Sequence, residues 1–280
     1  MMYRIEKVLN HNTVIAIHQD DHKEVLIMGK GVGFGRKVAE RIEVRPEDRL
    51  YSLQKYKERG GAKEIVKSIA PEFLELTNAV LNEAEKVFGK IDRMVLFPLA
   101  DHIAFAVKRI QNHEQISNPL TEDIRVLFHM EFKVAESIRP LLKKQFQIDI
   151  EDDEIGYVAL HIHSAIEDEK VSQAMQMARS VRECISMVEE AIGKPIDIAS
   201  LSYNRLMNHI RYMVARALSG EKLKVNMNDY MSVRFPKSYA LATSVCDRLA
   251  ASTGLTFDEM EIGYLAMHIE RVYSTCSPST

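Results

Sequence analysis

One pair of short motifs occurs twice in the chain, and this internal repeat constrains the fold more than any other feature. The stretch DHIAFAVKR at 101–109 returns 107 positions later as NHIRYMVAR at 208–216, and EIGYVALHI at 154–162 returns at the same offset as EIGYLAMHI at 261–269. Both copies separate their two histidines by 59 residues, so nothing is inserted or deleted between the motifs. Such self-similarity predicts a duplicated domain. Each copy holds two histidines at fixed places, namely His102 and His161, then His209 and His268.

Composition excludes several classes of protein. No apolar run approaches the length of a membrane span and the N-terminus has no signal-peptide pattern, so we expect a cytoplasmic protein with no membrane insertion. Three cysteines, far apart and odd in number, favour reduced structural thiols over disulfides or a zinc knuckle. Residues 1–55 hold ten Lys and Arg against eight Asp and Glu, a net charge of +2, and the remainder holds 27 against 32, a net of -5. A slightly basic head therefore precedes an acidic body.

The first 55 residues have the short β-branched runs of a small antiparallel sheet, with strands expected at 3–9, 13–18, 24–28, 38–44 and 50–53. A sheet this small gains stability from dimerising. Residues 56–63, with paired glycines and four charges, indicate a linker.

Downstream, apolar residues recur at helical spacing, which predicts one helical bundle at 64–170 and a second at 171–280. Helices are expected at 64–69, 72–88, 99–110, 153–165, 172–191, 200–218, 236–253 and 257–273, with one or two long helices over 122–144 and a polar loop before 236. The predicted fold class is α+β multidomain: a small antiparallel β-sheet domain followed by two duplicated all-α helical bundles.

A glycine-rich stretch, GKGVGFGRK at 29–37, is the most distinctive part of the head. Its glycine spacing fits neither a dinucleotide fingerprint nor a phosphate-binding loop, and on its own it is typical of a turn in a small sheet. Nearby residues favour nucleic acid, because lysine and arginine contact phosphates, phenylalanine stacks on bases and asparagine amides read base edges. Together these residues predict an RNA-reading sheet, and the contributing side chains are Asn10, Asn12, Lys30, Phe34, Arg36 and Lys37.

The repeated histidines can be interpreted in three ways. They can be core-edge side chains kept for packing, with Arg109 pairing Glu154 and Arg216 pairing Glu261; four matching positions weaken this interpretation, because Leu, Met or Gln would pack as well. They can ligate a metal, but no Glu-x-x-His motif is present. His161 and His163 stand at i and i+2 of a helix, so their side chains point apart. They can accept phosphoryl groups, each of which adds a charge of roughly -1.5 to -2 that an arginine can pair with. We predict the third, with no metal and no cofactor.

Helical spacing places these side chains on common faces. His102, Phe105 and Arg109 share one face of their helix, and His161 lies beside the stripe of apolar residues that faces the core, near the surface. The second copy repeats this arrangement. Each copy thus offers two histidines, one arginine and one glutamate at equivalent places.

This combination is similar to the sugar-responsive bacterial transcriptional antiterminators of the BglG/SacY type, which have a co-antiterminator RNA-binding domain and two phosphotransferase-system (PTS) regulation domains. The motifs that carry the resemblance are KVLNHN at 7–12, MGKGVGF at 28–34, DHI at 101–103, LHI at 160–162 and their second-copy partners. It covers residues 1–273, and the wording around His102 and His161 is most similar to the glucose-type antiterminators.

The resemblance implies a regulator and not an enzyme: a homodimer that binds a leader-RNA hairpin and prevents terminator formation in a sugar-utilisation operon. Its partners would be a histidine-containing phosphocarrier protein and a sugar-specific PTS permease in a bacterial cytoplasm. His102, His161, His209 and His268 fall at the phosphoryl-accepting positions, with Arg109, Arg216, Glu154 and Glu261 as supporting groups. Lys7, Asn10, Asn12, Gly29, Lys30, Gly31, Phe34 and Arg36 fall in the RNA-contacting motifs.

Three positions depart from the pattern of the family. The middle asparagine of the first motif is His11, the residue after Phe34 is Gly35, and Asp101 becomes Asn208 in the second copy. Two alternatives remain from other classes. A metal-dependent hydrolase with a β cap would need converging His and Asp ligands, and a DNA-binding activator would need a helix-turn-helix in place of the strands at 1–55.

Overall fold

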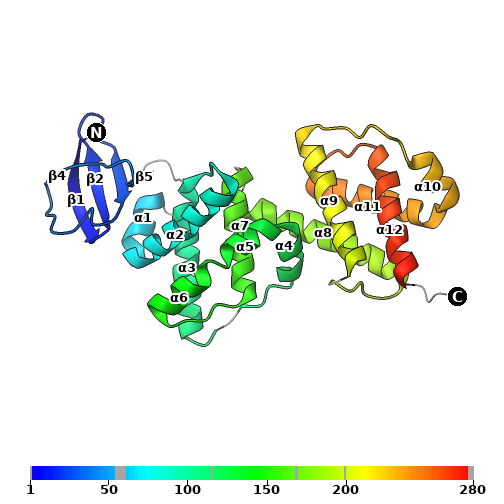
Figure 1. Cartoon of the computed structure of the whole chain (residues 1–280), viewed down its shortest axis with the longest axis horizontal. Coiled ribbons are helices and arrows are strands. Elements are labelled where there is room, and N and C mark those ends of the chain that lie inside the picture. Colours follow the sequence, from blue (N-terminus) through cyan, green and yellow to red (C-terminus); the bar gives the residue numbers. More distant parts are fainter. Residues whose placement is uncertain (1, 54–60, 115, 168–169, 199, 277–280) are drawn as a thin grey trace. The chain divides into compact units, whose positions relative to one another are not determined.

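The computed structural model describes residues 2–53, 61–114, 116–167, 170–198 and 200–276 (Figure 1). The chain forms two compact units. The first comprises Met1–Ser117 and Met130–Glu169, and the second comprises Asn118–His129 and Lys170–Thr280. The five-stranded antiparallel sheet at the N-terminus and the helices that follow confirm the predicted fold class.

The sheet, hereafter the head, has the strand order β4-β1-β2-β3-β5 and consists of β1 (Met2–Asn10), β2 (Thr13–His18), β3 (Glu24–Met28), β4 (Arg41–Glu43) and β5 (Arg49–Ser52). Every neighbouring pair is antiparallel. Strand β4 is shorter than the predicted 38–44, because 38–40 belong to a turn in which Ala39 has φ 72°. The backbone N–H of Ala39 still donates a 2.8 Å hydrogen bond to the carbonyl of Ile5.

Alternation along the strands buries both faces of the head. One face closes over a small core of its own, formed by Tyr3, Ile5, Val14, Ala16, Ile27, Val32 and Ile42. The opposite face presents a row of paired residues, Ile15, Leu26 and Tyr51, which are also buried. Tyr51 packs edge-on against Phe97 of a helix in the first unit, with ring centroids 6.0 Å apart. The head therefore has one independent core and one face that depends on the helices.

The first copy is built from short elements. They are α1 (Gly61–Ser68), α2 (Pro71–Phe88), the 3-10 turn η1 (Arg93–Val95), α3 (Leu96–Gln111), α4 (Thr121–Leu127), α5 (His129–Ala135), α6 (Ile138–Phe146) and α7 (Asp152–Glu167). Helix α1 already begins at Gly61, within the stretch expected to be a linker, and residues 56–60 lie outside the described residues. Pro71 is the first residue of α2, a position where its missing N–H costs no hydrogen bond.

The prediction of one or two long helices over 122–144 was wrong, since three helices occupy this stretch. The helices are interrupted at Phe128 and at 136–137, which separates α4, α5 and α6. Pro140, in the first turn of α6, explains the second break, because proline lacks the N–H that would bond to residue 136 and its ring clashes with that carbonyl.

The second copy has longer helices: α8 (Val171–Ile192), α9 (Leu201–Ser219), α10 (Asn228–Arg234), α11 (Pro236–Thr253) and α12 (Met260–Cys276). Where the first copy has Pro140, the second has Asp247, and α11 runs unbroken. Helix α10 falls where a polar loop was expected. It packs on α12, where the side chain of Asn228 accepts a 2.9 Å hydrogen bond from the backbone N–H of Gly263.

Candidate functional site

The glycine-rich stretch of the head folds back onto the turn between β1 and β2. The N–H groups of Gly29 and Gly33 donate to the backbone carbonyls of Asn12 and His11, each at 2.9 Å. Two of the glycines are required by close approach. A Cβ on Gly33 would lie 2.2 Å from the carbonyl oxygen of Asn10, and a Cβ on Gly29 would lie 1.8 Å from a carboxylate oxygen of Asp48. We call residues 10–13 and 29–36 together the RNA-facing turn.

The amides of Asn10 and Asn12, predicted to read base edges, are engaged inside this turn. Oδ1 of Asn10 accepts from the N–H of Asn12 at 2.9 Å, and Oδ1 of Asn12 accepts from the N–H of Gly31 at 2.8 Å. Both oxygens thus hold the backbone in shape. Their amide NH₂ groups are the parts of these side chains left for a ligand or for a neighbouring element.

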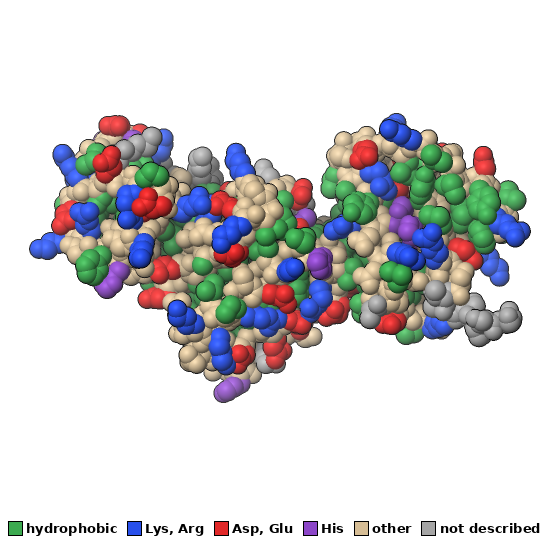
Figure 2. Space-filling model, viewed as in Figure 1, with side chains coloured by type: hydrophobic (Ala, Val, Ile, Leu, Met, Phe, Trp, Pro, Cys, Tyr) green, Lys and Arg blue, Asp and Glu red, His purple; other side chains and the backbone are tan. Residues whose placement is uncertain are grey.

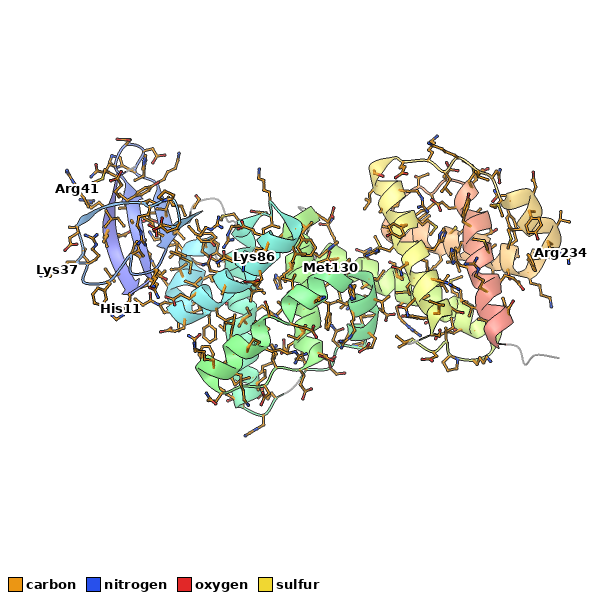
Figure 3. All side chains as sticks on the ribbon, viewed as in Figure 1. His11, Lys37, Arg41, Lys86, Met130 and Arg234 are labelled. Carbon is orange, nitrogen blue, oxygen red and sulfur yellow. The ribbon has the colours of Figure 1, made fainter. Side chains whose placement is uncertain are left out.

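Other predicted RNA contacts point into solvent. Lys7, Lys30 and Arg36 are exposed, and the ring of Phe34 is 68% exposed. The exposed side chain of His11 lies edge-on to that ring, with centroids 5.2 Å apart. His11 and Lys37 lie at the periphery of the head in Figure 3. A large aromatic ring held in water beside cationic side chains offers the stacking surface and the phosphate contacts that single-stranded RNA requires.

Sequence reasoning missed the brace that holds the Lys30 segment. The guanidinium of Arg45 donates at 2.8 Å to the carbonyl of Lys30 and at 2.7 Å to the buried carboxylate of Asp48. Asp48 also accepts from the backbone N–H of Arg45 at 2.9 Å. The only signal was the local order Arg-Pro-Glu-Asp at 45–48, a turn sequence in which a carboxylate can bond backward to the chain.

The first-copy motifs meet in a four-residue cluster on α3 and α7. The rings of His102 and His161 lie 5.4 Å apart. Nε2 of His102 is 3.2 Å from Oε2 of the buried Glu154, whose other oxygen accepts from Arg109 at 2.5 Å. The guanidinium of Arg109 also lies 4.8 Å above the ring of Phe105. The packing of α3 on α7 therefore brings together all four predicted residues of this copy.

Burial sets the electrostatics of the first-copy site. Desolvation, aided by the charge of His102, lowers the pKa of His161 to about 3, so this imidazole is neutral near pH 7. Burial on its own would raise the pKa of Glu154, but the neighbouring His102 and Arg109 outweigh it and lower that pKa. Nδ1 of His161 has no hydrogen-bond partner among the described residues. This nitrogen is buried, and the neutral imidazole as a whole keeps the lone pair that a nucleophile needs.

The second copy builds the same cluster on α9 and α12. His209 and His268 are stacked with centroids 4.7 Å apart. Arg216 donates two hydrogen bonds, of 2.6 and 2.8 Å, to the carboxylate of the buried Glu261, and Nε2 of His209 is 3.8 Å from the same carboxylate. One contact differs, because the cation above the Tyr212 ring is Arg211, at 5.0 Å.

Both histidines of the second copy are neutral near pH 7. Burial, with the charges of His268 and Arg216, lowers the pKa of His209 to about 3. Burial, with Arg271 and Arg205, lowers the pKa of His268 to about 4. Figure 2 shows histidine side chains reaching the surface of this unit among Lys and Arg side chains. An incoming phosphate would meet positive charge here.

Two tyrosines complete the clusters and were missed from sequence. The ring of Tyr157 lies 5.6 Å from that of His102, and the ring of Tyr264 lies 6.3 Å from that of His209. Both belong to the repeated EIGY motif, so their identity in the two copies was the available signal. Each tyrosine ring lies beside the first histidine of its pair.

The described part of the chain offers neither a metal site nor a membrane-spanning helix. No group of three or more His, Cys, Asp or Glu side chains is placed to hold a metal ion. No helix there combines the length and the apolar character needed to cross a bilayer.

Comparison with known families and proteins matches nearly the whole chain. The model of the PRD domain matches residues 62–165 and again residues 182–272, and the model of the CAT RNA binding domain matches residues 3–60. The glcA/glcB genes antiterminator of Staphylococcus carnosus is 29% identical over 274 residues, covering 95% of this chain and 94% of its own. Protein GlcT of Staphylococcus haemolyticus is 26% identical over 284 residues, covering 99% and 98%. A crystal structure of GlcT CAT-PRDI superimposes with a TM-score of 0.52 at 30% identity, over 59% of this chain and 99% of that one.

Proposed function

Because the chain belongs to the family of PRD-domain proteins, with a CAT RNA binding domain ahead of its two PRD copies, we propose that it is a transcriptional antiterminator. In this proposal a homodimer binds a hairpin in leader RNA through the RNA-facing turn and prevents an overlapping terminator from forming. Relatives named for the glcA/glcB genes and for GlcT support a glucose-type sugar operon as the target. The exposed Phe34 beside Lys30 and Arg36 supports RNA as the ligand.

The observation that carries the regulatory part is the recurrence of one cluster of two histidines, one arginine and one glutamate in both copies. A neutral imidazole nitrogen attacks the phosphorus carried by a phosphohistidine of the donor protein. The new N–P bond forms as the donor's N–P bond breaks, and the donor imidazole recovers its lone pair. Donors of the required chemistry are the histidine-containing phosphocarrier protein and a sugar-specific PTS permease.

Phosphorylation would rearrange the charges at each cluster. A phosphoryl group brings roughly -1.5 to -2 charge, which competes with Glu154 for Arg109 in the first copy and with Glu261 for Arg216 in the second. Shifting a two-state equilibrium from 1:99 to 99:1 requires about 5.5 kcal/mol. One to three charge-assisted hydrogen bonds per phosphate supply a substantial part of this free energy.

The proposal includes the organisation of the chain. Residues 1–55 form the RNA-binding domain, 56–63 the linker, 64–170 the first PTS regulation domain and 171–280 the second, in a protein that acts in the bacterial cytoplasm. The RNA contacts are Lys7, Asn10, Asn12, Gly29, Lys30, Gly31, Phe34 and Arg36.

The test is incubation with enzyme I, the phosphocarrier and phosphoenolpyruvate, with and without the permease, followed by mass spectrometry at neutral pH. We expect acid-labile phosphate that is lost in the variants H102A, H161A, H209A and H268A at the sites each removes. His163→Ala is the matched control, because this histidine lies on α7 outside the pair and contacts Glu131 at 3.0 Å. Absence of phosphate in the unaltered chain with all donors present would refute phosphorylation control.

A further inference from the structure

Helix α2 of the first copy holds the head through one face. The hydroxyl of Tyr51 donates at 2.7 Å to Asn78, and Arg49 donates at 2.7 Å to Glu85. Nearer the RNA-facing turn, the carboxylate of Glu75 lies 3.5 Å from the amide nitrogen of Asn12 and 3.5 Å from the hydroxyl of Thr13. We call the face that carries Glu75, Asn78 and Glu85 the α2 face. It touches the RNA-facing turn itself.

The equivalent face in the second unit is also occupied. Position 182 on α8 corresponds to position 75 on α2 at the repeat offset of 107, and it carries Arg182. Nη1 of Arg182 is 4.0 Å from the buried carboxylate of Asp123 on α4, which also accepts a 2.9 Å hydrogen bond from Tyr203. In both copies, therefore, the same helical face receives an element from outside its own bundle.

The charge of the residue at position 75 or 182 is opposite to that of the element packed on it. The first-copy face presents Glu75 to the head, and residues 1–55 have a net charge of +2. In the second copy, Arg182 bonds to Glu189 of its own helix and also lies 4.0 Å from Asp123, in the acidic first turn of α4. Opposite charges favour each pairing and disfavour the exchange. Glu75 is thus suited to a basic occupant.

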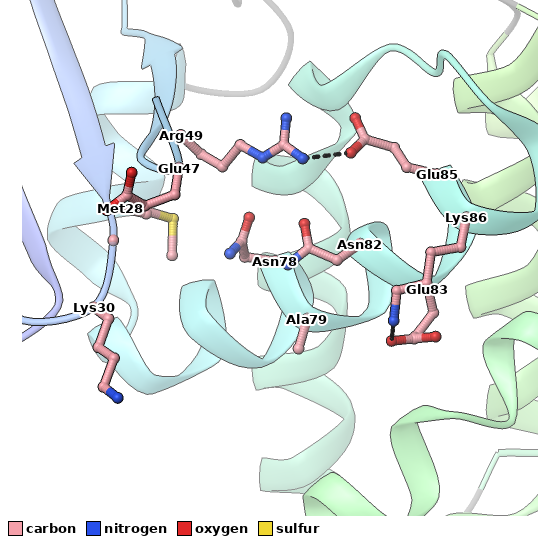
Figure 4. A pocket seen from close by; sticks show the side chains of 11 residues that line it. Met28, Lys30, Glu47, Arg49, Asn78, Ala79, Asn82, Glu83, Glu85 and Lys86 are labelled. Carbon is pink, nitrogen blue, oxygen red and sulfur yellow. Dashed lines mark hydrogen bonds and ion pairs between the residues drawn. The ribbon is translucent and has the colours of Figure 1, made fainter. Parts of the chain in front are cut away.

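RNA is the other ligand of the RNA-facing turn, and its charge is negative. Glu75 is not needed to shape the turn, because Asn12 already bonds to Gly31 and Asn10 through its Oδ1 and its N–H. Instead, Glu75 occupies the amide nitrogen of Asn12, the part left for a ligand. A cleft of about 650 Å³ lies between the Lys30 segment and α2 (Figure 4). Its acidic side chains, Glu47, Glu83 and Glu85, are matched by the basic Lys30, Arg49 and Lys86, so the unmatched negative charge near the turn is that of Glu75.

We propose that the α2 face competes with RNA for the RNA-facing turn and that Glu75 is the residue that opposes RNA there. This inference rests on the proposed RNA-binding function. Phosphates within roughly 10 Å of Glu75 are repelled at the ionic strengths used for binding assays. Removing this single charge should strengthen RNA binding about two- to fivefold at low salt.

The test measures RNA affinity of the full chain by fluorescence anisotropy. The probe is a labelled RNA hairpin selected by the unaltered chain from a pool with randomised loops. Glu75→Gln removes the charge and keeps an oxygen that accepts from Asn12 or Thr13. Glu64→Gln is the matched control, since it makes the same change in net charge at an exposed position of α1, next to the residue that pairs with Glu24 at the far end of β3.

The expected result is tighter binding by Glu75→Gln, a gain that shrinks as salt rises, and unchanged binding by Glu64→Gln. Equal or weaker binding by a Glu75→Gln chain with an unaltered melting temperature would overturn the inference, as would an equal gain in the control. Lys30→Ala separates this from the proposed function. If Lys30→Ala weakens binding and Glu75→Gln has no effect, only the competition fails; if no hairpin is selected at all, the RNA-binding function fails.

Discussion

The two PRD copies keep the same histidine cluster but differ in where an equivalent short helix packs. Helix α10 of the second copy lies on α12. Its counterpart 107 positions earlier, α4, lies in the second compact unit and not with most of the first copy, and it contacts α8 and α9. The residues at the start of these helices differ accordingly. Asn228 bonds to Gly263, while Thr121 bonds to the carbonyl of Asn118. Duplication thus preserved the chemistry of the histidine site independently of the packing around it.

The carboxylate at the centre of each cluster gives the largest expected effect. Glu261→Ala leaves the mostly buried Arg216 without the two hydrogen bonds that neutralise it, and breaking such a pair costs about 3–5 kcal/mol. Glu154→Ala should cost less, because Arg109 makes one hydrogen bond and keeps the ring of Phe105. Denaturant unfolding, with hydrogen exchange resolved by unit, measures both. A greater loss of unfolding free energy in Glu154→Ala than in Glu261→Ala would contradict this ranking.

Gly263 tests the packing that is specific to the second copy. A Cβ there would lie 2.7 Å from Oδ1 of Asn228 and 2.8–2.9 Å from the backbone of 227–228. Overpacking of this kind costs about 1–3 kcal/mol, so Gly263→Ala should destabilise the second unit by that amount. The double variant with Asn228→Ala should recover only part of the loss, because the backbone clash remains. Full recovery would place the clash in the side chain alone, and thermal unfolding followed by circular dichroism distinguishes the two.

Acidification should also separate the copies. The pKa of three histidines is lowered in the fold, to about 3 for His161 and His209 and about 4 for His268, against about 6.5 when unfolded. Their contribution to stability is complete above pH 6.5 and is lost as pH falls toward the folded values, because the unfolded chain then binds protons that the fold excludes.

Lowering the pH from about 6.5 to 5 should remove about 1–2 kcal/mol of folding stability for each of these histidines. The second unit, which contains two of these histidines, should open at a higher pH than the first unit, which contains one. The lowered pKa of Glu154 adds to the loss only below about pH 4.5. Hydrogen exchange compared at pH 7 and pH 5 tests the order, and His268→Gln should reduce the acid sensitivity of the second unit. Earlier opening of the first unit would contradict the assignment.

The amino-acid sequence was sufficient to predict an element where the spacing of its apolar and polar residues alone determines the structure. The spacing of His102, Phe105 and Arg109 gave a common helix face, and the strand patterns gave the head. The sequence does not show which contacts a side chain makes in three dimensions. The Oδ1 atoms of Asn10 and Asn12 accept from backbone N–H groups of the turn, which no spacing reveals. Pro140 was visible in sequence, but the strong apolar period of its neighbours masked its effect on the helix.

The smallest expected effect concerns the contact that places α4 in the second unit. Tyr203→Phe removes the hydroxyl that donates to Asp123, a carboxyl whose pKa burial already raises. Losing one such bond costs about 1–2 kcal/mol, and the loss should appear as faster hydrogen exchange within 121–127. Leu96, the counterpart of Tyr203 in the first copy, has no hydroxyl, so Leu96→Met is a matched core substitution that should leave this exchange unchanged. If Tyr203→Phe leaves α4 equally protected, apolar burial of Ile124 and Leu127 holds the helix, and the polar contact sets only its orientation.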